Sequence, residues 1–366
     1  MMMFLWNALM FLVVVGPLIF FHELGHYWVG RWSGIRAEAF SIGFGQEVAG
    51  WTDKRGTRWK IGWIPLGGYV RFAGDHNIDG SPAPNQPADG FETAALWRRA
   101  LTVAAGPVTN LLLAMLIYAG FIAAYGAISV TSQIAAIEPG SVAENAGFKP
   151  GDDIKAINAQ PVADFSDIKL IVMTHANRPL RVDVIRSGRL LSLIVTPRYI
   201  HGPDALGIDE EGGHIGIAPM AMRVPVPFYA IPLAAGQAVV GQVETTLHGL
   251  GMVLTGEAAP TQLHGPVKIA QMAGGVAHAG GLVLLEFAAF ISINLGFMNL
   301  LPVPVLDGGH LMFFAIEAVR RRPVSEVTRE RLLRGGLAAL LTLFLFVTLN
   351  DSGVFGMWKQ IADLIG

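Results

Sequence analysis

The sequence predicts a mainly α-helical, polytopic membrane protein with four transmembrane helices, a membrane-associated β-hairpin and one β-rich domain outside the membrane. Three observations predict this fold class. The 366 residues are 52% hydrophobic and only 15% charged, with a mean hydropathy of +0.48, which is typical of a membrane protein with a soluble part. Four long apolar segments occur along the chain, and residues 128–200 alternate between turn residues and short apolar strands.

The composition also excludes some classes of function. The net charge is −2 and no polybasic tail is present, which argues against a nucleic-acid partner. The chain has no cysteine, so disulfides, thiolate metal sites and cysteine nucleophiles are excluded. Residues 1–30 lack the basic start and the small-residue cleavage site of a signal peptide, so we expect them to stay as a transmembrane helix.

The four expected spans are about as long as a bilayer requires, which is about 20 apolar residues. They cover residues 4–29, about 101–125, 282–301 and 336–357. The last one is the least regular, because Asn350 and Asp351 interrupt it. An apolar helical stretch at 227–255 contains Glu244, and we expect it to lie along the membrane surface rather than to span it.

The distribution of lysine and arginine predicts the orientation. Residues 30–100 carry nine of these side chains and residues 320–334 carry six, whereas residues 1–29 carry none. Positive charge gathers in cytoplasmic loops, and a long segment such as 127–281 is translocated largely regardless of its charge. We therefore expect both termini and the β-rich domain outside, and the C-terminal end of the first span near the cytoplasmic side.

The first span ends in the motif His22-Glu23-Leu24-Gly25-His26. On a helix, residues four apart share one face, so the two imidazoles can bind one metal ion, usually Zn²⁺. Glu23 lies on a neighbouring face, where its carboxylate can accept a proton from a metal-activated water without being a ligand. The alternative is two histidines at the membrane interface beside a glutamate that reaches toward water.

A β-hairpin is expected between the first two spans. Residues 39–45 and 59–64 alternate as strands do, and residues 53–56 form a turn signal between them. Gly67 and Gly68 are expected to close the second strand. Such a sheet edge at the membrane offers a pairing site for an extended peptide.

The β-rich segment at 127–200 carries its own motifs. Strands are expected at 133–137 and 154–158, a helix at 165–175, and a hairpin around Ser187-Gly188. The run from Glu138 to Ala143, followed by Ala146 to Asp152, resembles a bacterial PDZ domain. That resemblance implies a groove that binds an extended peptide end. Residues 201–223 contain Gly and Pro and suggest a linker.

The third span breaks at the run that starts with Asn299 and ends Pro302-Val303-Pro304-Val305-Leu306-Asp307-Gly308-Gly309-His310. Two prolines two residues apart cannot lie inside a helix. Non-helical backbone at membrane depth is tolerated only where it is buried in protein or lines a cavity. A catalytic zinc takes three protein ligands, and Asp307 can supply the third. The alternative role of Asp307 is to cap the next helix. The rival candidates for the third ligand are His310 and Glu286.

Taken together, the HExxH motif and the Asn-x-x-Pro-x-Pro-x-Leu-Asp-Gly run resemble the site-2 protease family of intramembrane zinc metalloproteases, of the bacterial regulator-of-sigma-E protease type. Three further segments carry the same likeness: 40–45, 65–70 and 265–270. The chain has one PDZ-like domain where some relatives have two.

The resemblance implies one Zn²⁺ per chain, held by His22, His26 and Asp307, with Glu23 as catalytic base. It also implies substrate contacts from the hairpin and from the third span. The residues expected to make them are Asn294, Asn299, Gly43, Gly45, Gly67 and Gly68.

The implied function is cleavage of transmembrane segments of single-span membrane proteins in the bacterial inner membrane, with an anti-sigma factor or remnant signal peptides as substrates. The implied partners are these substrates, a peptide ligand of the PDZ-like domain and the lipid bilayer. Two other functions remain open: a non-catalytic membrane scaffold with a peptide-binding domain, and a zinc transporter or sensor. The corresponding domain limits are 1–126, 127–200, 201–281 and 282–366.

Overall fold

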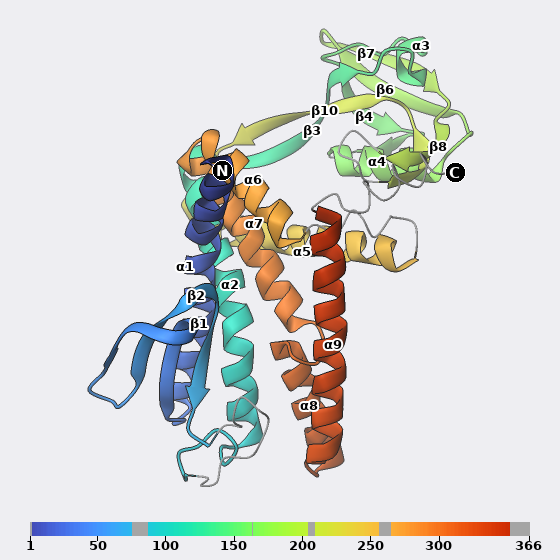
Figure 1. The fold of residues 1–366 in the computed structure, drawn as a ribbon. Helices are drawn as coiled ribbons and strands as arrows, with labels where there is room; N and C mark the ends of the chain where they lie inside the picture. The colour runs from blue at the N-terminus through green and yellow to red at the C-terminus, as the bar shows by residue number, and fades with distance from the viewer. Residues whose placement is uncertain (1, 75–86, 163, 204–208, 256–264, 352–366) are drawn as a thin grey trace, which may run out of the picture. The chain divides into compact units, whose positions relative to one another are not determined.

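The structure is a computed structural model of the chain, and it describes residues 2–74, 87–162, 164–203, 209–255 and 265–351. The chain divides into two compact units. The first unit consists of residues 1–120 together with 235–366, and the second of residues 121–234 (Figure 1).

Four helices of the described chain are long and apolar enough to cross a membrane, which matches the number of expected spans. They are α1 (Met2–Trp32), α2 (Leu96–Tyr125), α7 (Gly281–Leu300) and α9 (Glu326–Asp351). Further helices are α5 (Ile231–Thr255), α6 (Pro266–His278) and α8 (Asp307–Arg320), and the short helix η1 (Phe228–Ala230) directly precedes α5. Much of the surface of the four long helices is apolar and uncovered, as lipid contact requires.

The last long helix begins ten residues earlier than the apolar window suggested. Helix α9 starts at Glu326, and Oγ of Ser325 accepts a hydrogen bond from the backbone N–H of Thr328, as a capping residue does. Its first turns carry arginines, which form helices well but lower the mean hydropathy of any window that includes them. Residues 352–357 of the expected span lie outside the described residues.

Helices α1 and α2 pack closely because small residues meet at their crossing. A Cβ at Gly25 would lie 2.5 Å from the backbone oxygen of Ala105, so only glycine fits there. Around the C-terminal half of α1, an apolar cluster joins this helix, the β-hairpin and α8. Its members are buried and include Leu24, Tyr27, Phe40, Phe72 and Phe314. This cluster fixes the C-terminal half of α1 against the segments that bring the third site residue.

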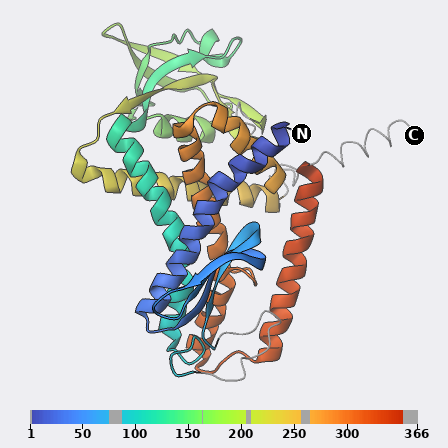
Figure 2. The ribbon, with the colours of Figure 1, turned by 60° about the vertical axis from the view of Figure 1, so that its left-hand side comes forward.

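The expected hairpin forms from two long strands, β1 (Ala37–Thr52) and β2 (Arg58–Phe72), which lie along the C-terminal half of α1 (Figures 1 and 2). Both strands bend, so the first part of β1 pairs with both ends of β2: Phe40 is opposite Trp59 and also opposite Val70. Gly67 does not close β2 as expected. With φ +88° it makes the bend, and β2 continues to Phe72.

Charged side chains tie α2, α8 and α9 together. Arg99 of α2 pairs with Glu92 at 2.5 Å and with Glu317 of α8 at 3.1 Å, and Arg329 of α9 pairs with Glu92 at 3.3 Å. Arg99 is buried. Charges removed from water must be paired, so this network fixes the relative position of the three helices near the site.

The second unit is a β-rich domain with its own core. Its main sheet has the strand order β10-β3-β4-β6-β7, with β5 paired to β4, and β8 pairs with β9. The strands are β3 (Ala127–Ile137), β4 (Asp153–Ile157), β5 (Gln160–Pro161), β6 (Leu180–Arg186), β7 (Arg189–Val195), β8 (Arg198–Pro203), β9 (Asp209–His214) and β10 (Ile217–Val224). Two short helices, α3 (Val142–Asn145) and α4 (Phe165–Thr174), cover buried side chains such as Ile154, Ile168 and Val182.

The described residues of 201–223, which are 201–203 and 209–223, are not the linker that their Gly and Pro content suggested. They form the end of β8, then β9 and most of β10, and β10 pairs with β3 some ninety positions earlier in the sequence. The glycines have a packing reason: a Cβ at Gly212 would lie 3.0 Å from the backbone oxygen of Met173 in α4. Such long-range pairing overrides local strand propensity.

One buried ion pair of this unit makes its stability depend on pH. Asp152 is fully buried, and its two carboxylate oxygens accept hydrogen bonds from Arg186, each at 2.7 Å. The backbone N–H of Lys149 donates a third, at 2.9 Å. Burial alone would raise the pKa of Asp152, but the bonds and charge of Arg186 and the Lys149 amide hold it below its usual value.

We therefore expect Asp152→Ala to lower the free energy of unfolding of this unit by about 3 kcal/mol at pH 7. A lowered folded-state pKa stabilises the fold above the unfolded pKa of about 3.9, and the effect is lost as the pH falls through the folded pKa. The difference between wild type and variant should therefore shrink below about pH 4. Hydrogen exchange of β4 and β6 in the full chain measures it, and a difference independent of pH would contradict this account.

Candidate metal centre and active-site cavity

Helix α1 brings the two histidines of the HExxH motif together near its C-terminal end. His22 and His26 lie one turn apart, with ring centroids 4.8 Å from each other. Their side chains are only 10% and 11% exposed. Two imidazoles buried in this way need partners or a metal ion, because unpaired polar groups at membrane depth are costly.

Asp307 reaches the same place from the segment that follows the third long helix. Helix α7 ends at Leu300, the two prolines keep residues 301–306 out of a helix, and Asp307 is the first residue of α8. The N-cap of α8 is Leu306, so Asp307 is not the capping residue of this helix. Its carboxylate lies against the histidines instead. Val305 has φ +89°, a strained value for a β-branched residue, so this segment is held in an unusual shape.

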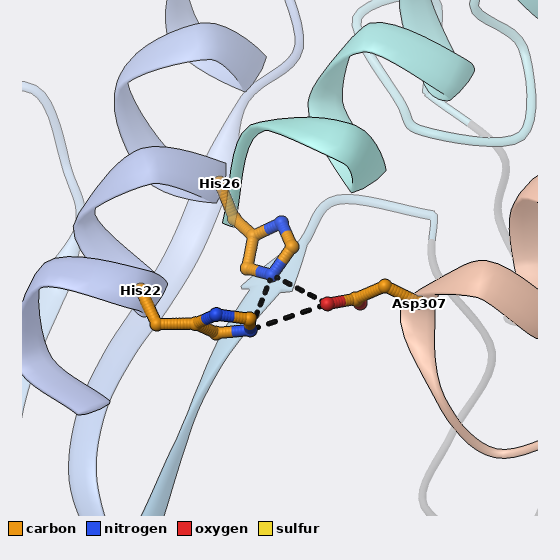
Figure 3. A group of neighbouring side chains, drawn as sticks. All are labelled: His22, His26 and Asp307. Carbon is orange, nitrogen blue, oxygen red and sulfur yellow. Dashed lines mark hydrogen bonds and ion pairs between the residues drawn. The ribbon is translucent and has the colours of Figure 1, made fainter. Parts of the chain in front are cut away.

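The three donor atoms form a nearly regular triangle (Figure 3). Nε2 of His22 lies 3.2 Å from Nε2 of His26 and 3.2 Å from Oδ2 of Asp307, and the third side is 3.5 Å. Tetrahedral Zn²⁺ with bonds of about 2.0–2.1 Å separates its ligand atoms by about 3.3 Å. The donor types and the triangle therefore both fit a zinc ion with one open coordination position.

The other nitrogen of each imidazole also fits metal binding. Nδ1 of His26 donates to the backbone oxygen of Thr102 at 2.9 Å, which leaves Nε2 free as a ligand. Nδ2 of Asn110 lies 3.3 Å from Nδ1 of His22, while Oδ1 of Asn110 is buried without a hydrogen-bond partner among the described residues. With a metal on Nε2, Nδ1 of His22 carries a proton, and a half-turn of the amide lets the orphaned Oδ1 accept it.

We infer that Asn110 is a positioning residue, one that the sequence did not reveal, since a single Asn in an apolar helix more often packs helices together. We expect Asn110→Leu to weaken zinc binding about 10–100-fold, because the imidazole of His22 loses its acceptor. Asn110→Asp keeps an acceptor and should retain most of the affinity. Competition with a chromophoric chelator measures both; unchanged affinity in Asn110→Leu would contradict this role.

The donor atoms line a cavity of about 480 Å³. Glu23 also lines it, outside the group of donor atoms, together with Val70 of β2. Among the expected substrate-contacting residues, the cavity lining includes Gly67, Gly68 and Asn299. A Cβ at Gly68 would lie 3.0 Å from Cγ of Glu23, so this strand passes very close to the glutamate.

Three other expected residues are placed elsewhere. Gly43 and Gly45 make bends of β1, with φ +83° and +88°, and neither lines the cavity. Asn294 does not line it either: its Oδ1 accepts from Thr246 of α5 at 3.0 Å and its Nδ2 donates to the oxygen of Phe290. Their contact with substrate stays a prediction.

The two rival ligands differ in position. His310 lines the cavity but lies outside the group of donor atoms that fits one metal ion among the described residues. Glu286 is more than three helical turns before Asn299 on α7 and does not line the cavity. The geometry thus favours Asp307 over both.

Two histidines at this spacing and an adjacent glutamate on an apolar helix, with a carboxylate from the break after another apolar helix, define a class: metalloproteases embedded in a membrane. The comparison with known proteins narrows the class. The model of peptidase family M50 matches residues 10–343. The chain belongs to this family, the site-2 proteases, and it is a zinc metalloprotease.

Relatives match nearly end to end. A protein of Rhizobium meliloti, whose name assigns it to the zinc metalloproteases, is 43% identical over 93% of this chain and 95% of its own length. A relative in Agrobacterium fabrum with a similar name is 42% identical over 97% and 96%. The metalloprotease MmpA of Caulobacter vibrioides is 36% identical over 99% of both chains.

Proposed function

We propose that this zinc metalloprotease cleaves peptide bonds within transmembrane segments of single-span membrane proteins. The observation that carries the proposal is the triangle of His22, His26 and Asp307, with sides of 3.2 to 3.5 Å, at the end of an apolar helix. In this proposal the three residues hold one Zn²⁺ and Glu23 is the general base.

Each residue of the chain then has a separate task. When bound, Zn²⁺ acts as a Lewis acid that polarises the scissile carbonyl and acidifies the attacking water. Glu23 accepts the proton of that water and passes it to the leaving amine. Asn110 and the backbone oxygen of Thr102 hold the two imidazoles in the required orientation.

A substrate helix must unwind before its carbonyl can reach the metal, because its backbone groups are engaged in intrahelical hydrogen bonds. In lipid the freed groups need new partners. Residues 68–72 of β2 pair only with β1 among the described residues, and Gly67 and Gly68 of this strand line the cavity beside Glu23. We propose that the unwound substrate pairs with this edge, and that Asn299 hydrogen-bonds the same stretch. Asn294 of α7 is proposed to contact a part of the substrate that lies outside the catalytic cavity.

The sequence resemblance supports the remaining parts of the proposal. An anti-sigma factor or remnant signal peptides are the proposed substrates. The β-rich unit is proposed to be a PDZ-like domain that binds an extended peptide end. The proposed location is the bacterial inner membrane, with both termini and this domain on the periplasmic side and the catalytic cavity toward the cytoplasm, because the Lys- and Arg-rich loops flank that end.

The proposal is tested with purified protein and single-span model substrates in proteoliposomes. We expect cleavage inside the hydrophobic segment, its loss with a zinc chelator and its recovery when zinc is added back. Mass spectrometry of the products gives the position of the cut. A chain that binds these substrates with no cleavage in any condition would instead be the scaffold alternative.

A further inference from the structure

A second cavity, of about 520 Å³, lies between the C-terminal turns of α1 and the turn that joins β1 to β2. It shares no lining residue with the catalytic cavity. Three cations line it: Arg31 from α1, and Lys54 and Arg55 from the turn. Trp28 and Trp32 of α1 also line it, and they are 55% and 84% exposed. We call this cavity the cationic pocket.

Asp53 holds the two sides of the cationic pocket together. Its Oδ1 accepts hydrogen bonds from the backbone N–H groups of Arg55 (2.8 Å) and Thr57 (3.0 Å), which shape the turn. Its Oδ2 accepts from Nε1 of Trp59 at 3.0 Å and from the hydroxyl of Tyr27 on α1 at 3.3 Å. The first two bonds shape the turn, the bond from Trp59 ties it to β2, and the bond from Tyr27 connects it to α1. The cations of both segments therefore line one space.

The charge of the pocket is not balanced within the protein. Three cations face one carboxylate, and the carboxylate already accepts four hydrogen bonds. None of Arg31, Lys54 and Arg55 forms an ion pair in the part of the chain that the structure describes. Guanidinium groups match the oxygens of a phosphate in pairs, and an ammonium adds a point charge. The chemistry therefore suits a phosphate ester.

The position of the pocket selects among phosphate esters. It lies at the end of a helix that is apolar enough to span a bilayer, beside two exposed indoles. Tryptophans gather at the level of lipid headgroups, and lysine and arginine next to a span attract anionic lipids. We propose that the cationic pocket binds the headgroup phosphate of an anionic phospholipid, with the acyl chains lying along the apolar face of α1.

The test uses the full-length protein in a neutral detergent, with native mass spectrometry to count bound lipid. The probes are phosphatidylglycerol, phosphatidylcholine of the same chain length, and inorganic phosphate. We expect phosphatidylglycerol to bind at least about tenfold more tightly than phosphatidylcholine. Inorganic phosphate at millimolar concentration should not displace it; full displacement would show a site for a soluble anion and overturn the lipid assignment.

Variants locate the site. Lys54→Gln/Arg55→Gln should weaken phosphatidylglycerol binding about 30-fold and, separately, Arg31→Gln about fivefold, because each cation contributes about 1 kcal/mol and both segments contribute to one pocket. The matched control, Arg321→Gln/Arg322→Gln, removes two exposed charges from another basic loop and should bind like wild type. An equal loss in the control, or no loss in Arg31→Gln, would show that lipid binds by diffuse charge and would overturn the proposal.

Discussion

Replacing Glu23 by glutamine is expected to lower the cleavage rate by about a thousandfold or more while zinc stays bound. The amide has nearly the same size as the carboxylate but cannot accept the proton of the attacking water. Glu23 lines the catalytic cavity and lies outside the group of donor atoms, so its neutralisation leaves the three ligands in place. Cleavage of a single-span substrate and the zinc content of the same preparation measure the two effects.

Two outcomes would contradict this role of Glu23. Cleavage at a rate near that of wild type would show that another group takes the proton. Loss of zinc together with activity would show that Glu23 is a ligand. Glu286→Gln on α7 is the matched control, since this residue does not line the cavity, and it should change neither rate nor zinc content.

Gly106→Ala is expected to remove zinc and activity together, even though it adds only one methyl group. A Cβ at this position of α2 would overlap Nε2 of His26, the atom that binds the metal in our proposal. The ring cannot give way without losing its bond to the backbone oxygen of Thr102. We expect zinc affinity to fall at least about 100-fold, because a ligand is displaced rather than merely reoriented.

A matched substitution on the same helix separates this effect from a general change of α2. Gly120→Ala meets nothing within 4 Å, so it should bind zinc and cleave substrate as wild type does. Alanine forms helices better than glycine, so neither variant should lose helix content by circular dichroism. A Gly106→Ala protein with normal zinc affinity would contradict the placement of His26.

Much of the candidate site could be predicted because its key residues are of types that are unusual in an apolar segment. Charged and polar groups at the end of an apolar run are costly, so His22, Glu23 and His26 indicated a site before any fold was known. The proline pair before Asp307 indicated a broken helix, and a break at membrane depth indicated a cavity. These arguments need only the types of neighbouring residues along the chain, which can be read from the sequence.

The residues that support the ligands could not be predicted in the same way. Asn110 acts on His22 only because α2 crosses α1 where Gly25 and Gly106 allow close approach. The spacing of Thr102, Gly106 and Asn110, four residues apart on one face of α2, is a signal that could have indicated them. When the partner helix is not known, small and polar residues on this face of α2 indicate only ordinary helix packing.

Long-range pairing explains the errors in the sheets. Gly67 looked like the end of a strand, but it is a bend that returns β2 to the first part of β1. Gly212 and Gly213 looked like linker residues, but they allow β9 to pack against α4. Gly67 is needed for its positive φ, whereas Gly212 and Gly213 are needed for a close approach to the backbone of α4. Composition alone cannot separate these uses from a flexible turn.

The most direct test of the account is the zinc content of two variants of the purified protein, Asp307→Ala and His310→Ala. The two residues are three positions apart and both line the cavity, but only Asp307 belongs to the triangle of donor atoms. We predict that wild type and His310→Ala each hold about one zinc per chain, as a single catalytic site requires, and that Asp307→Ala holds almost none. Zinc retained in Asp307→Ala and lost in His310→Ala would contradict the proposed metal centre.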